Sequence, residues 1–214
     1  MSTGKVRANV TREARVRRLP PEERRGQIVS AVLDVVAEYG VPEATIARIA
    51  KAANVSEGTL YVYFDSRKEM LLAALESILD EMYRLIDGSD GADALSRLRN
   101  IEEAHSREMK AERGLLAYPW FEFIAAGPQI GIRDAVADTH KSAYGHLKKI
   151  IEDGKVKGAI KADVDPDRLA WGFYTVLWAE NIACMMGMRE YLDQGHAAHI
   201  LNLILNDAAA PASV

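Results

Sequence analysis

Apolar residues recur every three or four positions along most of the chain, the spacing that places them on one face of an α-helix. Glycine and proline interrupt the pattern, and the sequence has no alternating strand pattern of useful length and no internal repeat. We therefore predict an all-α protein, with the first helix ending at Gly40 and the sixth at Gly127-Pro128. The expected helices cover residues 20–40, 45–53, 56–64, 66–85, 92–112, 114–126, 129–153, 166–187 and 196–206.

Hydroxyl side chains mark several of the expected helix starts. Thr45, Ser56 and Ser66 each precede an apolar-periodic segment, and a side-chain oxygen at that position accepts from an unpaired N–H of the first turn. Glu69 follows Ser66 by three residues, which is a capping-box pattern.

The stretch from Thr45 to Phe64 is expected to form two short helices joined by a tight turn. Ala50 is small where the helices would approach most closely, and Asn54 is a residue type that adopts a left-handed turn conformation. Leu60 would close the inner face of the second helix. This is the spacing of a helix-turn-helix, whose second helix enters the DNA major groove, although any pair of short packed helices can share it.

A longer string is more specific. The segment Val55-Ser-Glu-Gly-Thr-Leu-Tyr-Val-Tyr-Phe64, followed by Ser66-Arg-Lys-Glu-Met-Leu71, resembles the signature of TetR-family transcriptional regulators, and the resemblance covers about residues 24–75. It implies an N-terminal three-helix helix-turn-helix domain joined to a larger helical ligand-binding and dimerisation domain. It also implies a homodimeric repressor on a roughly palindromic double-stranded DNA operator, released by a small apolar or aromatic effector.

We divide the chain into four parts on this basis. Residues 1–19 form a basic arm, 20–65 the helix-turn-helix domain, 66–207 the helical ligand-binding and dimerisation domain, and 208–214 a frayed tail. The arm either lies free in solvent, as chain termini commonly do, or reaches phosphates or an adjacent minor groove.

The resemblance assigns DNA contacts to the second helix of the motif and to positions around it. Gly58 would let the backbone approach DNA closely, and Thr59 offers a hydroxyl to phosphate or a methyl to thymine. Tyr63 has a second interpretation as a half-buried core residue. The expected DNA-contacting residues are Thr45, Arg48, Ser56, Glu57, Gly58, Thr59, Tyr61, Tyr63 and Lys68, with Arg17 and Arg18 from the arm.

Two features of composition bear on DNA binding. The expected recognition helix contains no Arg, Lys, Asn or Gln, so we expect DNA shape, methyl contacts and the arm to outweigh direct readout. The net charge of −4 divides unevenly: residues 1–70 hold 12 Lys and Arg against 9 Asp and Glu, and residues 71–214 hold 15 against 22. A basic end on an acidic body fits a DNA-facing head.

Aromatic residues gather between residues 118 and 178, where the resemblance implies a small-molecule pocket. They are equally the ordinary content of a core. Glu180 and Asn181 lie in an apolar segment and must find polar partners, either in a pocket or across a dimer interface. The expected pocket residues are Trp120, Phe121, Phe123, Tyr144, Trp171, Tyr174, Trp178, Glu180 and Asn181, with Met82, Met185 and Met186 as further apolar candidates.

The segment 166–187 is apolar nearly all round, more than one subunit easily covers. Together with the last helix it is expected to form a four-helix dimer interface, as the resemblance implies. A membrane-spanning helix has a similar length, but Glu180 near its middle would cost roughly 2.5–3.5 kcal/mol in a bilayer, which favours a buried helix and no membrane association. The expected interface residues are Phe173, Leu177, Leu201, Ile204 and Leu205.

Sequence motifs give no support to enzymatic chemistry. The chain has no P-loop, dinucleotide-binding glycine turn, HExxH or CxxC, and His196 and His199 are expected on the surface. The single Cys184 excludes an intramolecular disulfide and fits a reducing cytoplasm. We expect no catalytic or metal site, no cofactor and a cytoplasmic location. Two alternatives stay open: a ligand-independent DNA-binding dimer, and a helical protein that processes small molecules.

Overall fold

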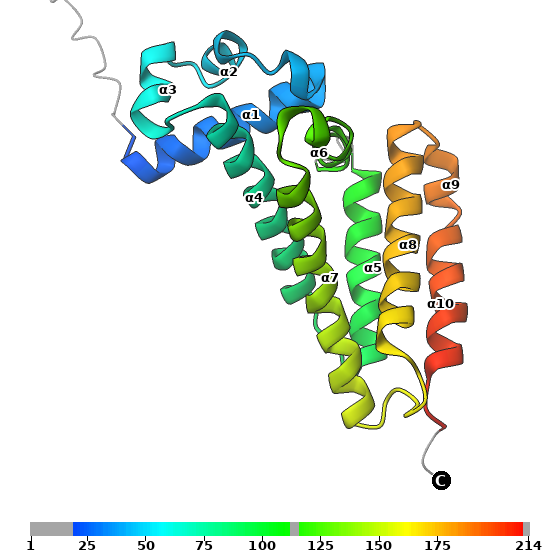
Figure 1. The fold of residues 1–214 in the computed structure, drawn as a ribbon. Coiled ribbons are helices and arrows are strands. Elements are labelled where there is room, and N and C mark those ends of the chain that lie inside the picture. The colour runs from blue at the N-terminus through cyan, green and yellow to red at the C-terminus, as the bar shows by residue number, and fades with distance from the viewer. Residues whose placement is uncertain (1–18, 112–115, 212–214) are drawn as a thin grey trace, which may run out of the picture.

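The computed structural model describes residues 19–111 and 116–211, and within these ranges it contains ten helices (Figure 1). The predicted all-α fold class is confirmed. The helices are α1 (Pro21–Glu43), α2 (Ile46–Ala52), α3 (Glu57–Tyr63), α4 (Arg67–Asp87), α5 (Ala94–Lys110), α6 (Ala117–Ile130), α7 (Arg133–Val156), α8 (Pro166–Met185), α9 (Arg189–Asp193) and α10 (His196–Ala208). No described helix has both the length and the apolar character needed to cross a membrane.

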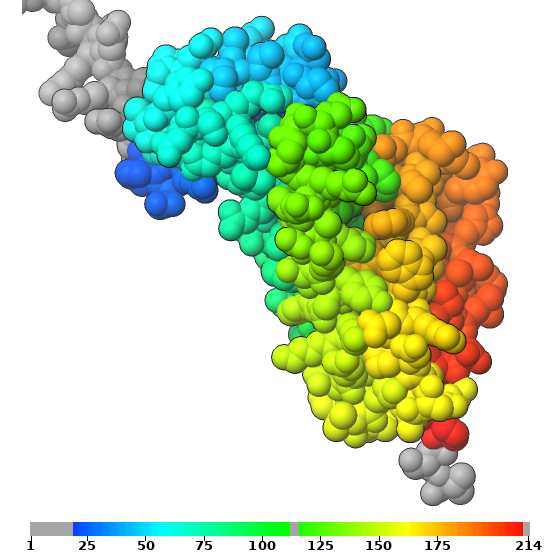
Figure 2. Space-filling view, viewed as in Figure 1, coloured from blue at the N-terminus to red at the C-terminus, as the bar shows by residue number. Residues whose placement is uncertain are grey.

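Helices α1 to α3 form a head at one end of the molecule, and the longer helices form a body that extends away from it (Figures 1 and 2). Ile28 and Val32 of α1 are fully buried against Leu60 of α3 and the start of α4. Gly40 has a φ of 79°, so the regular part of α1 ends there as predicted, and Val41 to Glu43 form a separate turn.

The predicted N-caps are confirmed at three helices. Thr45, Ser56 and Ser66 each accept a hydrogen bond from the backbone N–H three residues later, at 3.3, 3.2 and 3.2 Å. The capping box at α4 differs in one detail, because the Glu69 carboxylate accepts from the N–H of Asp65 at 2.6 Å. Its partner therefore lies one residue before the cap.

Two apolar cores lie along the molecule. The first fills the head and continues into α6 and the start of α7, where Trp120 and Phe123 belong to it. The second lies in the body between the end of α4 and helices α5, α7, α8 and α10, with Phe173 and Leu205 at its centre. Because the first core spans the expected boundary at residues 65 and 66, the head is packed directly onto the body.

The predicted end of the sixth helix is wrong. Helix α6 continues through Gly127 and Pro128 to Ile130, and it ends at Gly131, whose φ is 69°. Pro128 lacks an N–H, but in the last turn this removes only one helical hydrogen bond. The left-handed Gly131 closes the helix through its N–H, which donates to the Gly127 carbonyl.

The expected frayed tail is wrong for its first residues. Ala208 is the last residue of α10, and Ala209 forms an isolated antiparallel bridge with Ile160. The N–H of Ala210 donates to the carbonyl of Ala159 at 3.1 Å. The chain after α10 is therefore tied to the loop after α7 up to residue 210, and residues 212–214 lie outside the described ranges.

Candidate DNA interface and ligand pocket

Helices α2 and α3 and the turn between them form a helix-turn-helix. Asn54 has a φ of 52°, the left-handed conformation predicted for the turn. Ala50 and Leu60 are buried between the helices, and the N–H of Val55 donates to the Ala50 carbonyl at 3.0 Å. These contacts fix α3 relative to α2, with Thr45 exposed at the start of α2.

The N-terminal end of α3 is open to solvent. Ser56, Glu57 and Gly58 are exposed, and Thr59 is partly exposed with its hydroxyl 2.8 Å from that of Ser56. A Cβ added to Gly58 would meet only the Ser56 hydroxyl oxygen, at 3.9 Å. Another molecule can therefore approach the backbone here without obstruction from the protein, as the prediction of base-facing residues requires.

The tyrosines of α3 divide between surface and core. Tyr61 is exposed, whereas Tyr63 is partly buried against the first core, which fits its second interpretation. Val62 is 76% exposed. The sequence prediction did not include it, because a valine between two tyrosines is typical of a core position. Its methyl groups suit contact with thymine, so we add Val62 to the predicted DNA-contacting residues.

Two of the predicted phosphate-contacting residues have partners within the protein. Arg48 forms an ion pair with Glu43 at 2.5 Å. Lys68 donates from Nζ to the Gly131 carbonyl at 3.0 Å, which ties the start of α4 to the corner between α6 and α7. Lys68 therefore has a structural contact of its own besides any contact with DNA. Arg17 and Arg18 lie outside the described residues.

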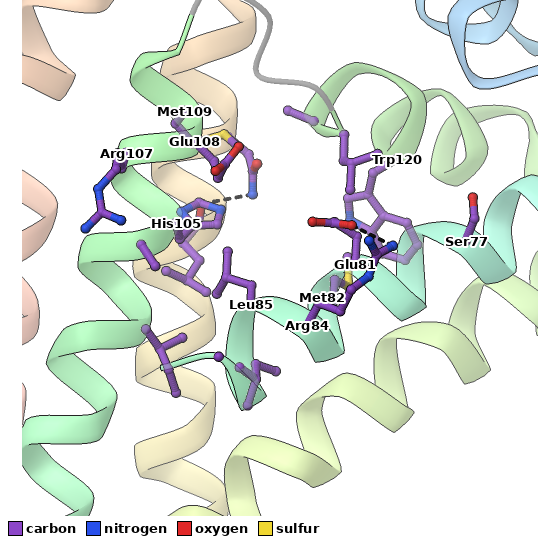
Figure 3. Close-up of a pocket in the computed structure, with 18 of the residues that line it drawn as sticks. Ser77, Glu81, Met82, Arg84, Leu85, His105, Arg107, Glu108, Met109 and Trp120 are labelled. Atoms are coloured by element: carbon purple, nitrogen blue, oxygen red, sulfur yellow. Dashed lines mark hydrogen bonds and ion pairs between the residues drawn. The ribbon is translucent and has the colours of Figure 1, made fainter. Parts of the chain in front are cut away.

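A pocket of about 720 Å³ lies between the head and the body. Its walls come from α1, α4, α5, α6, α7 and α8, and they are mostly apolar. Met82 and Leu85 of α4 face His105 and Met109 of α5 across it, with Trp120 of α6 beside them (Figure 3). A pocket of this size and character can hold a drug-sized organic molecule.

Four of the nine predicted pocket residues line this pocket: Trp120, Tyr174, Trp178 and Asn181. Met82 lines it as well, whereas Met185 and Met186 do not. The pocket also takes residues from α1 and α5, which the prediction did not include because it followed the aromatic residues. Helical spacing held the missing signal, since Ile101, His105 and Met109 lie four residues apart on one face of α5.

Five predicted pocket residues lie elsewhere. Phe123 is fully buried in the first core, and Phe121 packs against it. Trp171 is 56% exposed on the outer side of α8. Glu180 is buried behind the pocket wall, against His105. Aromatic content alone could not separate these environments, because core, surface and pocket all use the same residue types.

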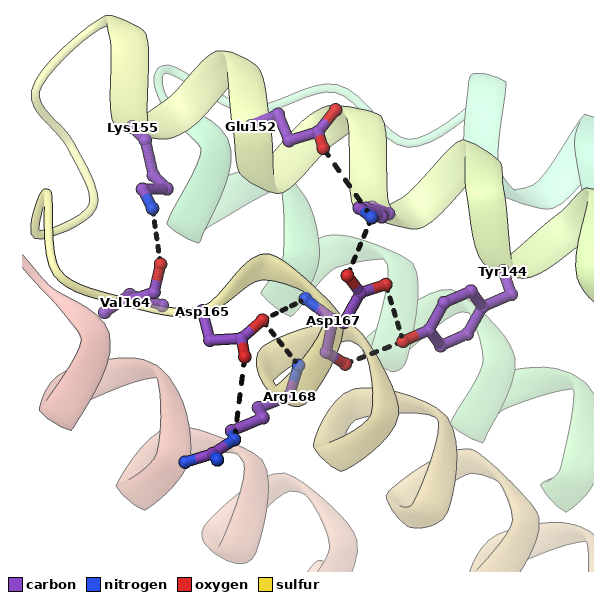
Figure 4. Close-up of polar contacts among 8 residues, drawn as sticks. Tyr144, Glu152, Lys155, Val164, Asp165, Asp167 and Arg168 are labelled. Atoms are coloured by element: carbon purple, nitrogen blue, oxygen red, sulfur yellow. Dashed lines mark hydrogen bonds and ion pairs between the residues drawn. The ribbon is translucent and has the colours of Figure 1, made fainter.

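Tyr144, the fifth of these, belongs to a polar network that ties α7 to the start of α8 (Figure 4). Its hydroxyl donates to the backbone carbonyl of Asp167 at 2.7 Å, and Lys148 pairs with the Asp167 carboxylate at 2.7 Å. Burial and the Asp167 carboxylate raise the pKa of the Tyr144 phenol, so it stays protonated as a donor. The network fixes the α7–α8 corner far from the head.

A buried polar cluster lies behind the pocket wall, between α5 and α8. His105 Nδ1 is 2.8 Å from Glu180 Oε2, and the two side chains are 12% and 3% exposed. Glu102, 5% exposed, lies nearby, and one of its carboxyl oxygens has no hydrogen-bond partner among the described residues. Burial, with a smaller contribution from Glu180, raises the pKa of Glu102 to about 7.

The pocket is linked directly to the head. Val29 and Leu33 of α1 line it together with the body helices. Helix α6, which contributes Trp120 to the pocket, also holds the end of α1, because Glu122 Oε2 accepts from the N–H of Val41 at 3.3 Å. Movement of α6 on ligand binding would therefore act on α1 through a side-chain hydrogen bond.

Helices α8 and α10 pack side by side at the edge of the body (Figure 1), and their outer face is apolar. The exposed residues are Trp171, Ile182, Ile200 and Leu203, between 45% and 56% exposed. These residues are open to contact by a second copy, whereas most of the predicted interface residues are not. Phe173, Leu201 and Leu205 point inward and are at most 1% exposed in the second core, and Leu177 and Ile204 are partly buried against it.

This correction has a simple cause. Helix α8 is apolar on nearly every side, so the sequence does not distinguish the face that packs against α5 and α7 from the outer one. Only the packing of the neighbouring helices does so.

The fold and the exposed helix-turn-helix define a helical DNA-binding protein with a ligand-sized pocket in its body. Comparison with known proteins agrees with this class. Residues 28–74 match the family described as "Bacterial regulatory proteins, tetR family". The helix-turn-helix region of the chain is therefore of the TetR family, and the chain is a helix-turn-helix transcriptional regulator.

Three relatives illustrate the similarity. The chain is 24% identical to the fatty acid metabolism regulator protein of Bacillus subtilis over 65% of this chain and 72% of that protein. It is 32% identical to the transcriptional regulator HbdR of an Aromatoleum species over 56% of this chain, and that match spans about half of HbdR, 54%. The structure of the regulator FadR from Bacillus subtilis, solved with stearoyl-CoA, has a TM-score of 0.68 at 20% identity, covering 84% of this chain and 97% of FadR.

Proposed function

We propose that the chain is a homodimeric repressor that leaves its operator when an elongated apolar molecule fills the pocket. The observation that carries this proposal is the composition of the pocket wall. Val29 and Leu33 come from the DNA-binding head and Met82 and Leu85 from the body, so a ligand would contact both parts at once. A ligand shifts an equilibrium only by binding one arrangement better than another, and a junction pocket makes such a difference possible.

The ligand class follows from the walls of the pocket and from one relative. The pocket is mostly apolar. The FadR structure with a similar fold was solved with stearoyl-CoA, an apolar chain with a polar end. An acyl compound is therefore the first ligand to test, ahead of a compact aromatic molecule.

The division of labour within the chain is part of the proposal. Residues 20–65 would bind DNA through the exposed positions of α2 and α3, and the body would bind the effector and the second subunit. Helix α4 and the contact between Glu122 and Val41 would transmit the change to the head. Two heads on one dimer would meet successive major grooves, about 34–36 Å apart.

The test begins with selection of bound sequences from random DNA, which should yield a roughly palindromic site. Fluorescence anisotropy on that site, with and without dodecanoate or dodecanoyl-CoA, then measures release. We expect Tyr61→Ala to weaken binding several-fold, and Tyr191→Ala, an equally exposed tyrosine on α9, to leave it unchanged. Lack of salt-dependent DNA affinity would contradict the proposal.

A pocket-filling variant separates the effector-released repressor from a ligand-independent dimer. Leu85→Trp places an indole in the pocket and should reduce ligand binding and release together. Val156→Trp, at an exposed position of α7 outside the pocket, is the matched control. If the operator stays bound with every acyl compound and both variants behave as the unmodified protein, the chain is a ligand-independent DNA-binding dimer.

A further inference from the structure

A buried pair lies at the pocket: His105 lines the wall, and Glu180 lies behind it. The Glu180 carboxylate is 3% exposed, and a carboxylate buried to this degree needs a counter-charge. Among the described residues, His105 is the basic side chain within 4.0 Å of it, with Nδ1 at 2.8 Å from Oε2. In the imidazolium form of a histidine both ring nitrogens carry a hydrogen.

Within the described chain, only one of the two ring nitrogens of His105 has a hydrogen-bond partner. Nδ1 donates to Glu180, and no described residue accepts a hydrogen bond from Nε2. His105 itself lines the pocket (Figure 3). The pair therefore presents Nε2 at the surface of a mostly apolar cavity, with the ring orientation fixed from behind. The other charged side chains that line the cavity are Glu81, Arg84, Arg107 and Glu108.

We propose that His105 is protonated when the effector is bound and recognises its polar end, donating from Nε2 to an oxygen at the end of an apolar chain, either a carboxylate or a thioester carbonyl. This assignment rests on the proposed ligand response, because it gives the chemistry of the same pocket. Glu180 positions the ring and balances its charge. A ligand that ends in an ammonium group offers no acceptor and would be repelled.

The buried His140 does not offer a comparable site. Its Nδ1 has no partner among the described residues, but the space beside it is only about 10 Å³, bounded by Trp171, Tyr174 and Trp178. That is room for one water molecule. The pocket beside His105 is about 720 Å³, large enough for a chain of many carbon atoms.

The second buried acid does not cancel this donor at neutral pH. Glu102 precedes His105 by three residues on α5, and its raised pKa of about 7 keeps much of it uncharged there. In the proposed complex, the Glu180 carboxylate contacts Nδ1 of His105, and a ligand carboxylate would accept from Nε2.

Direct binding to the full chain tests the assignment. Fluorescence of Trp120 and Trp178, which line the pocket, reports titrations with dodecanoate, dodecanoyl-CoA and dodecylamine. We expect the better of the two acyl compounds to bind at least about tenfold more tightly than dodecylamine. Comparison of the two identifies the source of the oxygen: tighter binding of dodecanoate assigns a free carboxylate, and tighter binding of dodecanoyl-CoA a thioester.

The key variant combines His105→Phe with Glu180→Gln, so that no buried carboxylate loses its partner. It should weaken acyl binding about tenfold and change dodecylamine binding less than threefold. The control combines His146→Phe with Asp87→Asn, which removes another histidine–carboxylate pair, also at 2.8 Å, that does not line the pocket. This control variant should bind all three ligands with the affinities of the unmodified protein.

In the unmodified protein, the ¹⁵N resonance of His105 Nε2 should shift on acyl binding, which a purely structural histidine would not show.

Each outcome separates this proposal from the proposed function. Equal losses for all three ligands, no loss, tighter binding of dodecylamine, or no acyl binding at all would overturn the role of His105. If acyl compounds release the operator equally well from the double variant and from the unmodified protein, the role of His105 is overturned too. The proposal of a ligand-released repressor would then stand. His105-dependent binding without release would leave His105 as the anchor and reject the repressor mechanism.

Discussion

Gly58 is a glycine within a helix, where glycine is less stable than alanine by about 0.5–1 kcal/mol. A Cβ at this position meets no protein atom closer than 3.9 Å. Packing within the subunit therefore gives no reason for a glycine here, whereas close approach of DNA to the backbone would.

We predict that Gly58→Ala stabilises the protein by about 0.5 kcal/mol and weakens operator binding about tenfold, as a wrong base pair does. Urea denaturation and fluorescence anisotropy measure the two effects. Gly145→Ala is the matched control, because this glycine of α7 is helical, exposed and free of neighbours within 4 Å. It should gain stability without loss of DNA affinity. Equal DNA affinities for the two variants would show that the backbone at Gly58 does not approach DNA.

Glu102 should make stability depend on pH in a definite direction. Its pKa is raised from 4.5 to about 7, so between these values the unfolded chain releases a proton that the folded protein retains. Stability therefore falls as pH rises from about 4.5 and levels off above about 7. Glu102→Gln removes this loss and should be more stable than the unmodified protein by about 2–3 kcal/mol at pH 8.

The comparison of two pH values isolates this effect. Near pH 5 the variant and the unmodified protein should differ little, because both then have an uncharged side chain at position 102 in the folded state. Urea denaturation at both pH values gives the difference, and Glu103→Gln, an exposed neighbour, should show none. The same stability difference at pH 5 and pH 8 would contradict the assignment of the raised pKa.

At single positions, local chemistry was readable from the sequence and long-range chemistry was not. The caps at Thr45 and Ser56 depend on residues within three positions, and both were predicted. The pair of His105 and Glu180 joins positions 75 apart in the sequence. No local pattern brings them together, and the sequence showed only that Glu180 needs a partner.

Among the elements, α6 has the most consequential position. It lines the pocket with Trp120 and reaches α1 through the hydrogen bond from Val41 N–H to Glu122. The Lys68 contact with Gly131 holds the other end of the same helix against α4. Because α6 contacts the pocket, α1 and α4, a displacement of α6 at the pocket can reach both α1 and α4.

We predict that Glu122→Ala and Lys68→Met each leave ligand binding within about twofold and reduce ligand-induced operator release. The expected loss of coupling is about 0.5–2 kcal/mol, a few-fold to thirtyfold smaller shift in operator affinity. Titrations of ligand with and without operator measure it. Lys141→Met, a surface lysine of α7 paired with Asp138, is the control. Unchanged release in both variants would exclude this route and leave α4 alone as the transmitter.

The helices show where sequence patterns stop being informative. Most boundaries follow from caps, glycines and prolines, which act locally. The outer face of α8 could not be predicted, because Trp171 and Phe173 are both large, apolar and two residues apart, yet one is 56% exposed and the other fully buried. Most of the predicted interface residues therefore lie on the inward side of α8 and α10. In the same way, the aromatic stretch indicated a pocket but not the contributions of α1 and α5.

For the whole molecule, the exposed apolar face of α8 and α10 is the surface that most needs a partner. Trp171, Ile182, Ile200 and Leu203 would otherwise remain in water, and exposed apolar patches of this kind mark protein interfaces. The head, in contrast, lies at the opposite side of the body from this face (Figure 1). A second copy packed on this face would leave both heads free.

We predict that Leu203→Arg converts the dimer to a monomer, because a guanidinium placed in an apolar interface loses its hydration and meets its own copy across the two-fold axis or an apolar neighbour. Leu203 is 56% exposed in the subunit, so the subunit itself should stay folded, with a melting temperature close to that of the unmodified monomer. Sedimentation should show half the mass, and affinity for the palindromic operator should fall by two orders of magnitude or more, since each head then binds its half-site alone.

Val156→Arg, 89% exposed on α7, is the control and should change neither the mass nor the operator affinity. A Leu203→Arg variant that still sediments as a dimer would place the interface on another face of the body, while a monomer with unchanged operator affinity would show that one head is sufficient for binding.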